Sequence, residues 1–444
     1  MKIIPFKTKI AICGLGYVGF PVALLFAKKG FSVVGVDVKA ERVKKINRGG
    51  CPIEGKEPGL KELMAEVRQK KTFRATTEPE AYQEAEVIIV AVETPVQDDT
   101  HEPAYTAMKA ALICIGRNMT KDTLVIVEST IAPGTMAHLV KPILEDESGL
   151  KVNEEFLLAN CPERLMPGHL LENIQNYNRV IGGMSKEATK TAKDLYQYIV
   201  KGKLDETDSV TAEIVKAGEN AYRDVQIAFA NEMALLCEAL GADVWQVRTL
   251  INDCKKVKET RPEALRQMHL PGAGVGGHCI PKDSWLLTYG AKNLMDPKII
   301  PLARQINDFM PQHTFDLVKQ AFKEASKNMV GAKIVVLGFA YAGNSDDIRN
   351  TPAEPLISYL EKAGAKVVVH DPYVKAFKGS LAKIVKGASA LVLVTDHDQY
   401  KILSYNRLKG LMKISKPILV DGRNVFDKAA ATQAGFIYKG IGNI

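Results

Sequence analysis

The sequence contains no C-x-x-C pair, although the chain of 444 residues has seven cysteines. Their number is odd and they are widely spaced, so the sequence supports neither a disulfide framework nor a zinc site. We therefore expect no bound metal, and we expect reduced thiols, which are typical of cytoplasmic proteins.

Long apolar runs and a clustered basic patch are also absent. No run of about 18 apolar residues, the length that crosses a membrane, appears, and Met1–Lys9 is too short and too polar for a signal peptide. The net charge is +8, but the lysines and arginines are scattered and are not interleaved with aromatics, which make up 7% of the chain. We expect no membrane and no nucleic acid as partners, whereas a modest positive excess suits an anionic small molecule.

A short apolar strand at residues 9–13 runs into a G-x-G-x-x-G motif, Gly14–Gly19, and an apolar helical stretch follows. Glycines at these positions permit a tight turn and a close approach of a pyrophosphate to the helix N-terminus. A second strand ends at Asp37, where a carboxylate can bind a ribose diol and repel the 2′-phosphate of NADP. Lys39 and Arg42 lie close enough to weaken that repulsion. The pattern predicts an NAD-binding domain.

A second informative stretch, residues 272–283, places Cys279 on a glycine-rich loop with Lys282 and Asp283 just beyond it. Pro281 suits the first turn of a helix, so we expect Cys279 at a helix N-terminus. The helix dipole and a nearby lysine would lower the pKa of the thiol and populate the nucleophilic thiolate. A packed cysteine in a glycine turn is the alternative, and the nucleotide-type motif at the N-terminus favours the nucleophile.

From Lys9 to about Val200 the pattern alternates strands with helices, as a parallel doubly wound sheet requires. The predicted strands are Ile10–Cys13, Val33–Val36, Val87–Val92, Leu124–Glu128, Phe156–Ala159 and Arg179–Ile181. Ligands of such sheets bind beyond the carboxyl ends of the strands. The loops with Thr94 and Thr130 follow two of these strands, and we expect the nicotinamide and the substrate to meet there.

The segment Ser209–Leu240 contains no proline and predicts one long helix. Its apolar residues wrap more than one face, which indicates packing against its own domains and against a second subunit in a homodimer. Lys216, Asn220 and Arg223 share one face at i, i+4 and i+7. Either a solvated stripe or a row aimed into a cleft explains them.

From about Gly331 a second strand–turn–helix–strand unit echoes the first and ends near Asp371, but it lacks G-x-G-x-x-G. It is either a domain for another nucleotide-like ligand or a structural domain. A composition of 46% hydrophobic and 25% charged residues is typical of a globular protein. The predicted fold class is α/β, with two Rossmann-like doubly wound domains joined by a long central helix. We place the parts at residues 1–200, 201–315 and 316–444.

Several ordered motifs resemble the UDP-glucose/GDP-mannose dehydrogenase family over essentially the whole chain. They are Gly14–Gly19, Ser129-Thr130, Pro162-Glu163-Arg164, Lys216…Asn220…Asn231-Glu232, Gly276–Asp283 and Asp346–Arg349. The resemblance implies two Rossmann-like domains joined by a long helix. It also implies the four-electron oxidation of a sugar's primary alcohol to a carboxylate, with two NAD⁺ and a covalent thioester to cysteine.

Within the family, the segment C-P-E-R-L-M-P-G at residues 161–168 is similar to the P-E-R-x-x-P-G form of the N-acetylhexosamine branch. The resemblance therefore implies a UDP-N-acetylhexosamine substrate, with UDP-N-acetyl-D-mannosamine expected and a product used in polysaccharide synthesis. UDP-N-acetylglucosamine and UDP-glucose are the alternatives. Family members usually carry lysine where this chain has Ala342, so a phosphate contact is missing or supplied elsewhere.

Other classes of protein fit the sequence less well. A two-electron 3-hydroxyacid or 6-phosphogluconate-type dehydrogenase would need neither Cys279 nor a second nucleotide domain. Aldehyde dehydrogenases also use cysteine and NAD, but the N-terminal motif and the second domain do not suit them. A nucleotide-sugar sensor is the non-enzymatic alternative, and the presence of every reactive position argues against it.

The resemblance implies a role for each candidate residue. The catalytic residues are Cys279 as nucleophile, Lys216 and Asn220 as stabilisers of oxyanions, Asp283 with Glu163 for proton movement, and Thr130 to orient water. The cofactor residues are Gly14, Gly16, Tyr17, Val18, Gly19, Asp37, Arg42, Thr94, Thr130 and Lys282. The substrate residues are Glu163, Arg164, Lys216, Asn220, Arg223, Gly272, Gly276, His278, Tyr341 and Arg349.

Some of these substrate assignments are more specific. We expect the glycine loop against the uracil or ribose, Arg349 at the diphosphate, and Arg164 or His278 at the N-acetyl group. Arg261 or Arg266 would either reach the site of a neighbouring subunit or carry only surface charge.

Overall fold

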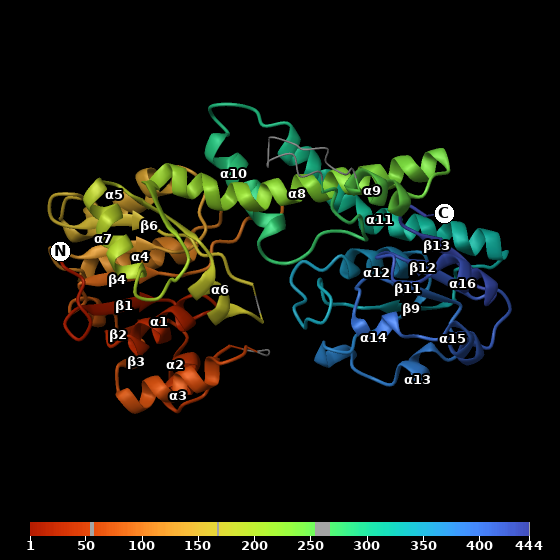
Figure 1. Ribbon diagram of the computed structural model, residues 1–444, viewed down its shortest axis with the longest axis horizontal. Helices are drawn as coiled ribbons and strands as arrows, with labels where there is room; N and C mark the ends of the chain where they lie inside the picture. The colour runs from red at the N-terminus through yellow and green to blue at the C-terminus, as the bar shows by residue number, and fades with distance from the viewer. Residues whose placement is uncertain (54–56, 167, 254–266, 444) are drawn as a thin grey trace. The chain divides into compact units, whose positions relative to one another are not determined.

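The structure, a computed structural model, describes residues 1–53, 57–166, 168–253 and 267–443. The chain forms two compact units (Figure 1). Unit 1 consists of Met1–Glu219 and Trp285–Asp296, and unit 2 of Asn220–Ser284 and Pro297–Ile444. Two helices, α8 (Ser209–Leu240) and α10 (Ile280–Ala291), have their first and last parts in different units. Arg261 and Arg266 lie outside the described residues.

Unit 1 is built on an eight-stranded sheet with the order β3-β2-β1-β4-β5-β6-β7-β8. Its strands are β1 (Lys9–Cys13), β2 (Ser32–Val36), β3 (Phe73–Thr76), β4 (Val87–Val90), β5 (Leu124–Val127), β6 (Leu157–Asn160), β7 (Arg179–Gly183) and β8 (Leu204–Asp208). All neighbours are parallel except β6 and β7. The first six strands have the strand order of a dinucleotide-binding fold. In this order, strands are added on one side of β1 up to β3 and then on its other side from β4 onward. The predicted doubly wound sheet is confirmed, and β3 and β8 extend it.

Helices cover both faces of this sheet, so its central strands are buried on both sides. Ile10 and Ile12 of β1 pack into one core, and Ala11 and Cys13 pack into the other. This alternation follows from the two-residue period of a strand. The first core is closed by α1 (Gly19–Lys28), α2 (Ala40–Asn47), α3 (Leu60–Lys70), α6 (Leu170–Asn176) and α7 (Lys186–Tyr196), and the second by α4 (Thr106–Asn118) and α5 (Lys141–Ser148).

Unit 2 contains a five-stranded parallel sheet with the order β10-β9-β11-β12-β13. Its strands are β9 (Lys333–Leu337), β10 (Lys366–His370), β11 (Ala390–Leu393), β12 (Ile418–Asp421) and β13 (Ile437–Gly440). One face packs on α11 (Ile299–Ala325) and α12 (Ala353–Lys362), and the other on α13 (Leu381–Val385), α15 (Tyr405–Met412) and α16 (Lys428–Gln433). The second Rossmann-like domain is therefore confirmed.

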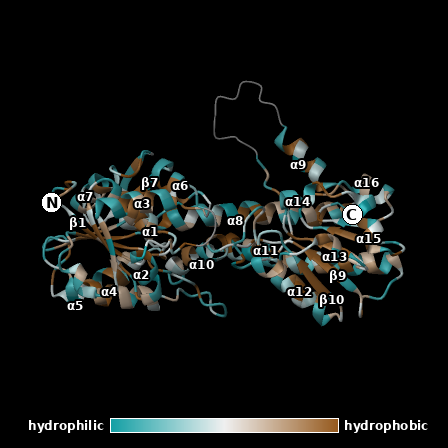
Figure 2. Cartoon of the chain, turned by 90° about the horizontal axis from the view of Figure 1, so that it is seen from below, coloured by the Kyte–Doolittle hydropathy of each residue, from teal (hydrophilic) through white to brown (hydrophobic). Residues whose placement is uncertain are grey.

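The long helix α8 has the bounds that the sequence predicted. Figure 2 shows that hydrophobic residues concentrate in the strands of each sheet, while the outer surfaces of the helices are largely hydrophilic. In the described part of the chain, no helix combines the length and the hydropathy needed to cross a membrane.

Candidate functional site

The turn after β1 has the geometry of a phosphate-binding loop. Gly14 has φ 92°, and a Cβ there would lie 2.5 Å from the carbonyl oxygen of Ala91. A Cβ at Gly19 would lie 1.9 Å from the carbonyl oxygen of Gly14, so the start of α1 packs directly on the turn. A Cβ at Gly16, in contrast, would meet no atom within 4 Å. A pyrophosphate therefore has room beside the backbone at the N-terminus of α1.

Asp37 lies at the end of β2 and is almost completely buried. Its carboxylate accepts hydrogen bonds from the backbone N–H groups of Leu15 (2.8 Å) and Lys39 (2.9 Å) and from Arg42 Nη1 (2.8 Å). A carboxylate has about four acceptor positions, so capacity for a ribose hydroxyl remains. These residues fit an NAD ribose and place a cation beside it.

The loops after β4 and β5 are joined by side-chain hydrogen bonds. Thr94 Oγ1 donates to the carbonyl oxygen of Thr130 at 2.6 Å, and Ser129 Oγ donates to that of Val92 at 2.6 Å. Both loops lie at the carboxyl ends of adjacent parallel strands, β4 and β5. The fold thus brings together two of the predicted cofactor residues, Thr94 and Thr130.

Glu213, which the sequence analysis did not single out, anchors the continuation of the Thr130 loop. Its carboxylate accepts hydrogen bonds from the backbone N–H groups of Gly134 (2.8 Å) and Met136 (2.7 Å). Burial raises the pKa of Glu213 to about 7, although the two backbone hydrogen bonds act in the opposite direction. Glu213 and the buried Lys216 lie one turn apart on α8.

Glu163 and Arg164 follow β6 in the segment that resembled the N-acetylhexosamine branch. Glu163 is buried, and its carboxylate accepts a hydrogen bond from the backbone N–H of Leu165. Arg164 binds both carboxylate oxygens of Glu219 on α8, with 2.9 Å from Nε to Oε2, and also donates to the carbonyl oxygen of Asn178. The guanidinium of Arg164 thus already holds an acidic partner.

A buried ion pair lies directly before the Ser129-Thr130 loop. Arg179 at the start of β7 pairs with Glu128, which directly precedes Ser129, and both side chains are inaccessible to solvent. Arg179 Cζ also lies 5.1 Å from the ring centre of Tyr196. An ion pair of this kind holds the ends of β5 and β7 together. Sequence reasoning treated these residues only as strand positions.

In unit 2, α10 begins at Ile280, immediately after Cys279. The backbone N–H groups of Lys282 and Asp283 donate to the carbonyl oxygen of Cys279 at 3.1 and 2.8 Å, so Cys279 is the residue that starts the helix. The expected position of this cysteine at a helix N-terminus is confirmed. Cys279 is half-buried.

Asp283, one turn further along α10, is fully buried, with one hydrogen-bond donor and one ion-pair partner. Asn220 Nδ2 donates to Asp283 Oδ2 at 2.6 Å, and Lys282 Nζ lies 2.8 Å from Asp283 Oδ1. Three of the predicted site residues therefore meet around one carboxylate. The sequence assigned Lys282 to the cofactor, and in the structure its ammonium group is paired with Asp283.

The glycine loop owes part of its glycine content to close packing against the loops of the second sheet. A Cβ at Gly272 would lie 2.4 Å from Arg423 Nη1, and one at Gly276 would lie 2.6 Å from Tyr341 Cβ. The N–H of Gly277 donates to the carbonyl oxygen of Arg349 at 2.9 Å. These glycines are needed because the backbone of the loop lies too close to the C-terminal domain to leave room for a Cβ.

The remaining predicted substrate residues lie near this loop or on α8. Arg349 binds Asp347 through two carboxylate oxygens, with 2.9 Å from Nε to Oδ1. Burial, together with Lys282 and Arg349, lowers the pKa of His278. Arg223 is exposed on α8. Arg423, which follows β12 and donates to the carbonyl oxygen of Gly274 at 3.2 Å, is a further basic residue that the motifs did not identify.

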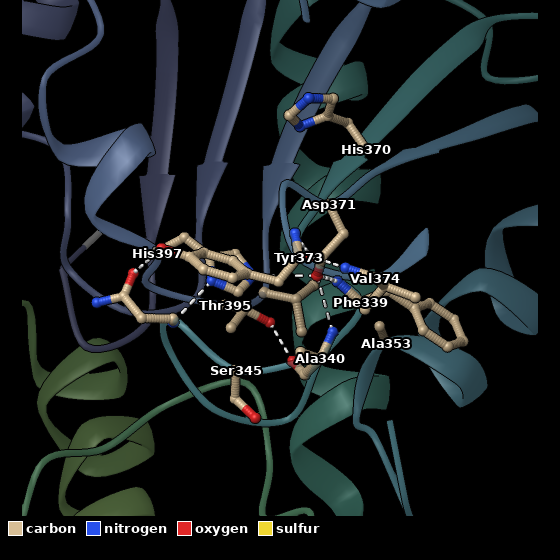
Figure 3. A network of polar contacts seen from close by, with 12 residues as sticks. Phe339, Ala340, Ser345, Ala353, His370, Asp371, Tyr373, Val374, Thr395 and His397 are labelled. Carbon is tan, nitrogen blue, oxygen red and sulfur yellow. Dashed lines mark hydrogen bonds and ion pairs between the residues drawn. The ribbon is translucent and has the colours of Figure 1, made fainter. Parts of the chain in front are cut away.

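The second Rossmann-like unit repeats the turn of the first but uses its acid differently. Gly338 has φ 92°, the same value as Gly14. Figure 3 shows the carboxylate of Asp371 among its donors, which include the backbone N–H groups of Ala340 (2.9 Å) and Val374 (3.0 Å) and the His397 side chain (3.0 Å). Burial alone would raise the pKa of Asp371, but these hydrogen bonds hold it well below its usual range. Asp371 is therefore a structural acid of the turn.

Comparison with known proteins agrees with this geometry. Residues 8–200 match the NAD binding domain of the UDP-glucose/GDP-mannose dehydrogenase family, residues 210–309 its central domain and residues 335–428 its UDP binding domain. The chain belongs to this family. Its cofactor is NAD, and the expected class of NAD-dependent nucleotide-sugar dehydrogenase is confirmed.

Three relatives illustrate the similarity. The UDP-N-acetyl-D-mannosamine dehydrogenase of Pyrococcus horikoshii is 38% identical over 434 residues, which are 98% of this chain and 99% of that protein. The solved structure of the P. horikoshii enzyme superposes with a TM-score of 0.90. A solved NDP-N-acetyl-D-galactosaminuronic acid dehydrogenase from Methanosarcina mazei has 38% identity and a TM-score of 0.89, over 98% of this chain and 95% of that one. A UDP-N-acetyl-D-mannosamine dehydrogenase from Campylobacter jejuni is 37% identical over 83% of this chain and 87% of its own length.

Proposed function

We propose that this protein oxidises the C-6 hydroxymethyl group of UDP-N-acetyl-D-mannosamine to the carboxylate of UDP-N-acetyl-D-mannosaminuronate. Relatives that carry the name of this activity match almost the whole chain, which supports the substrate. The observation that carries the chemistry is the placement of Cys279 at the start of α10, one turn before a buried carboxylate, Asp283.

Gly14, Gly16, Gly19 and Asp37 would hold two NAD⁺ molecules in turn, and each would supply the acceptor for one hydride. Tyr17, Val18, Arg42 and Thr94 complete the proposed cofactor site. The open space at Gly16 and the spare acceptor capacity of Asp37 support this assignment.

Cys279 forms the covalent intermediate in this proposal. After the first oxidation, the thiolate sulfur adds to the aldehyde carbon, a C–S bond forms, and the carbonyl π bond breaks with its electron pair on oxygen. Loss of the second hydride converts the adduct to a thioester. Water then adds to the thioester carbonyl, the C–S bond breaks, and the thiolate and the carboxylate product are released. Covalent capture keeps the reactive aldehyde bound between the two oxidations.

The other catalytic roles follow from charge and hydrogen-bonding capacity. Lys216 and Asn220 stabilise the oxyanions through a cation and an amide donor, which favours the tetrahedral states. Asp283 and Glu163 accept and return protons, and Thr130 orients the attacking water. The hydrogen bond from Asn220 to Asp283 supports a common role for these two residues.

Substrate binding is assigned to the glycine loop, the loop after β9 and several charged side chains. We assign Gly272, Gly276, Tyr341 and Arg349 to the nucleotide, and the hydrogen bonds between the glycine loop and the loop after β9 support a common site. Arg164, His278 and Arg223 are proposed to contact the sugar or its phosphates. For Arg164 and Arg349, binding of substrate then has to compete with the partners Glu219 and Asp347.

We also propose a homodimer that forms through the central helix. In unit 2, α8 and α11 expose large apolar side chains, among them Phe229, Leu236 and Leu240 of α8 and Leu302 and Phe309 of α11. Exposed apolar residues at helical spacing are typical of a surface that another subunit covers. Light scattering should give twice the mass of the chain, and Phe229→Glu should shift it toward the monomer. A wild-type monomer at micromolar concentration would contradict the proposal.

The division into an NAD-binding part (1–200), a central part with the cysteine loop (201–315) and a nucleotide-sugar part (316–444) is proposed for the mechanism. We propose the cytoplasm as its location, since none of the six described cysteines forms a disulfide with another. The uronate product suits polysaccharide synthesis, because it is an activated acidic sugar.

The experiment that tests the proposed function measures NADH released per sugar with excess NAD⁺. UDP-N-acetylmannosamine, UDP-N-acetylglucosamine, UDP-glucose and UDP-N-acetylgalactosamine are supplied separately in limiting amounts. Two NADH from UDP-N-acetylmannosamine alone is the expected result. Two NADH from another sugar would change the substrate but keep the chemistry, and the similarity to the M. mazei protein makes the galacto sugar a specific comparison. One NADH would remove the thioester step, and none from any sugar would favour a sensor.

A further inference from the structure

The first residue of the glycine loop is held by a buried amide. The backbone N–H of Gly272 donates to Asn231 Oδ1 at 2.9 Å. Asn231 lies on α8 and is fully buried. A backbone N–H can only donate, so this contact fixes which atom of the Asn231 amide faces the loop, and its nitrogen has to point away from the loop.

The amide nitrogen of Asn231 continues a chain of hydrogen bonds toward a carboxylate. Asn231 Nδ2 donates to Asn307 Oδ1 at 2.8 Å, and Asn307 Nδ2 donates to Asp224 Oδ1 at 2.7 Å. Asn307 lies on α11 and Asp224 on α8, and both are buried. Each amide is oriented by its neighbour, so the relay runs in one direction, from the N–H of Gly272 to Asp224.

The same carboxylate also holds the other end of the segment that carries Cys279. Ser284 Oγ, directly after Asp283 on α10, donates to Asp224 Oδ2 at 3.0 Å. Arg304 Nη1 donates to Asp224 Oδ1 at 2.7 Å and balances its charge. Gly272 and Ser284 therefore bracket the cysteine loop, and both are tied to one buried ion pair. All of these residues belong to unit 2.

We propose that Asn231 and Asn307 are positioning residues for Cys279. The relay holds the start of the glycine loop in place relative to Asp224, and Ser284 holds its end to the same carboxylate. Together they keep the Cys279 thiol at the N-terminus of α10, where the thiolate is reactive. The expected loss of catalytic turnover rests on the proposed function, whereas the expected change in the reactivity of the Cys279 thiol does not.

The test uses Asn231→Asp in the full-length protein. An ionised aspartate has no donor for Asn307 Oδ1, whereas a protonated one has the O–H that replaces the amide N–H. The rate at which iodoacetamide alkylates Cys279 is followed on its peptide by mass spectrometry between about pH 5 and pH 9. We expect the ratio of variant to wild-type rate to fall by about 10- to 100-fold as the introduced carboxyl group ionises, because a displaced reacting group loses rate on this scale.

A matched control separates this effect from the charge of an added aspartate. Asn328 is exposed, and its Oδ1 accepts from the backbone N–H of Val330 at 2.9 Å, a contact that an aspartate keeps. Asn328→Asp should therefore leave the alkylation profile unchanged. A change in thermal stability alone, with an unchanged alkylation profile, would show that Asn231 is only structural.

A second variant covers the case in which the carboxyl group introduced by Asn231→Asp stays protonated throughout. Asn231→Ala removes both bonding atoms and should lower Cys279 alkylation at every pH, measured below the unfolding temperature. With the sugar that the NADH assay identifies as the substrate, kcat should fall more than KM rises, since the relay acts on the thiol. Wild-type alkylation in both Asn231→Asp and Asn231→Ala would overturn the proposal. Failure of the wild-type protein to oxidise any sugar would count against the proposed function and leave the alkylation result valid.

Discussion

Asn220 donates a 2.6 Å hydrogen bond to Asp283, and this contact joins α8 to the helix that begins after Cys279. The two residues are 63 positions apart in the chain. Asp283 also forms an ion pair with Lys282, and one helix turn separates its carboxylate from the cysteine. This carboxylate keeps acceptor positions that can take a proton, which makes Asp283 a direct place to test the mechanism.

Asp283→Asn should lower kcat by at least about 100-fold, because the variant keeps the shape of the side chain but cannot accept a proton. An amide still accepts from Asn220, but the buried ammonium group of Lys282 loses its partner, so the thermal unfolding of the variant is measured alongside. Steady-state NADH production measures the effect. Asp253→Asn, at the end of α9 (Val244–Asn252), is the control and should keep the wild-type rate. A kcat within a few-fold of wild type for Asp283→Asn would remove this residue from proton transfer.

Cys279→Ser should lose net acid production and thioester formation, because a neutral serine hydroxyl is a far poorer nucleophile than a thiolate and its alkoxide is not populated at neutral pH. Binding of the UDP-sugar should stay within a few-fold of wild type in calorimetry. Cys51→Ser, at a half-buried free thiol in unit 1, serves as the control. Full turnover to the acid by Cys279→Ser would exclude a covalent step at this residue.

Asp37→Ala should shift the cofactor preference toward NADP. The change removes the acceptor for the ribose diol and releases Arg42, whose Nη1 lies 2.8 Å from Asp37 Oδ2, to meet a 2′-phosphate. We expect the ratio of kcat/KM for NAD⁺ to that for NADP⁺ to fall by about 10- to 100-fold, the worth of one or two hydrogen bonds to charged groups. Adding Arg42→Ala should remove the gain with NADP⁺. An unchanged ratio of kcat/KM for NAD⁺ to that for NADP⁺ in Asp37→Ala would show that Asp37 does not bind the ribose.

Glu213→Gln should change how stability depends on pH. Burial raises the pKa of Glu213 from 4.5 to about 7, so the folded chain holds this proton more tightly than the unfolded chain. The protonated group stabilises the fold below about pH 4.5, and this contribution is lost as the pH rises to about 7. Its full size is at most about 3 kcal/mol, at 1.36 kcal/mol for each pH unit.

The measurement is the free energy of unfolding of wild type and Glu213→Gln, by denaturant titration between pH 4.5 and pH 8. The stability of Glu213→Gln relative to wild type should rise across this range, since glutamine carries no charge to bury. Glu62→Gln, at an exposed position on α3, should show no such trend. Parallel pH curves for wild type and Glu213→Gln would contradict the prediction.

Arg179→Met should destabilise unit 1 by about 3–5 kcal/mol, because it leaves the carboxylate of Glu128 buried without its partner. Glu128→Gln combined with Arg179→Met should recover most of this loss, since no unpaired charge remains. Chemical denaturation of the four proteins in the cycle gives the coupling energy. Additive losses in the double variant would show that the two side chains do not interact in solution.

Local patterns were enough to predict much of this architecture. The glycine motif at Gly14–Gly19, the strand that ends at Asp37 and the bounds of α8 all depend on residues close in sequence. Turn geometry, helix propensity and apolar periodicity act over short distances, so the sequence reports them directly. The strands β3 and β8 were not predicted, because β3, with the sequence F-R-A-T, is not a continuous apolar run and β8, with the sequence L-D-E-T-D, is polar.

By itself the sequence determined the two nucleotide-type folds, the helix between them and the place of Cys279 at a helix start. Only the tertiary structure decided what the reactive segments touch. It paired Arg164 with Glu219, set the glycine loop against Tyr341 and Arg423, and brought Asn231 to Gly272 across about 40 residues of chain, a separation for which no sequence period exists. Such contacts form because packing of the apolar cores buries polar groups, which then need hydrogen-bond partners. Which partners are within reach depends on the whole fold.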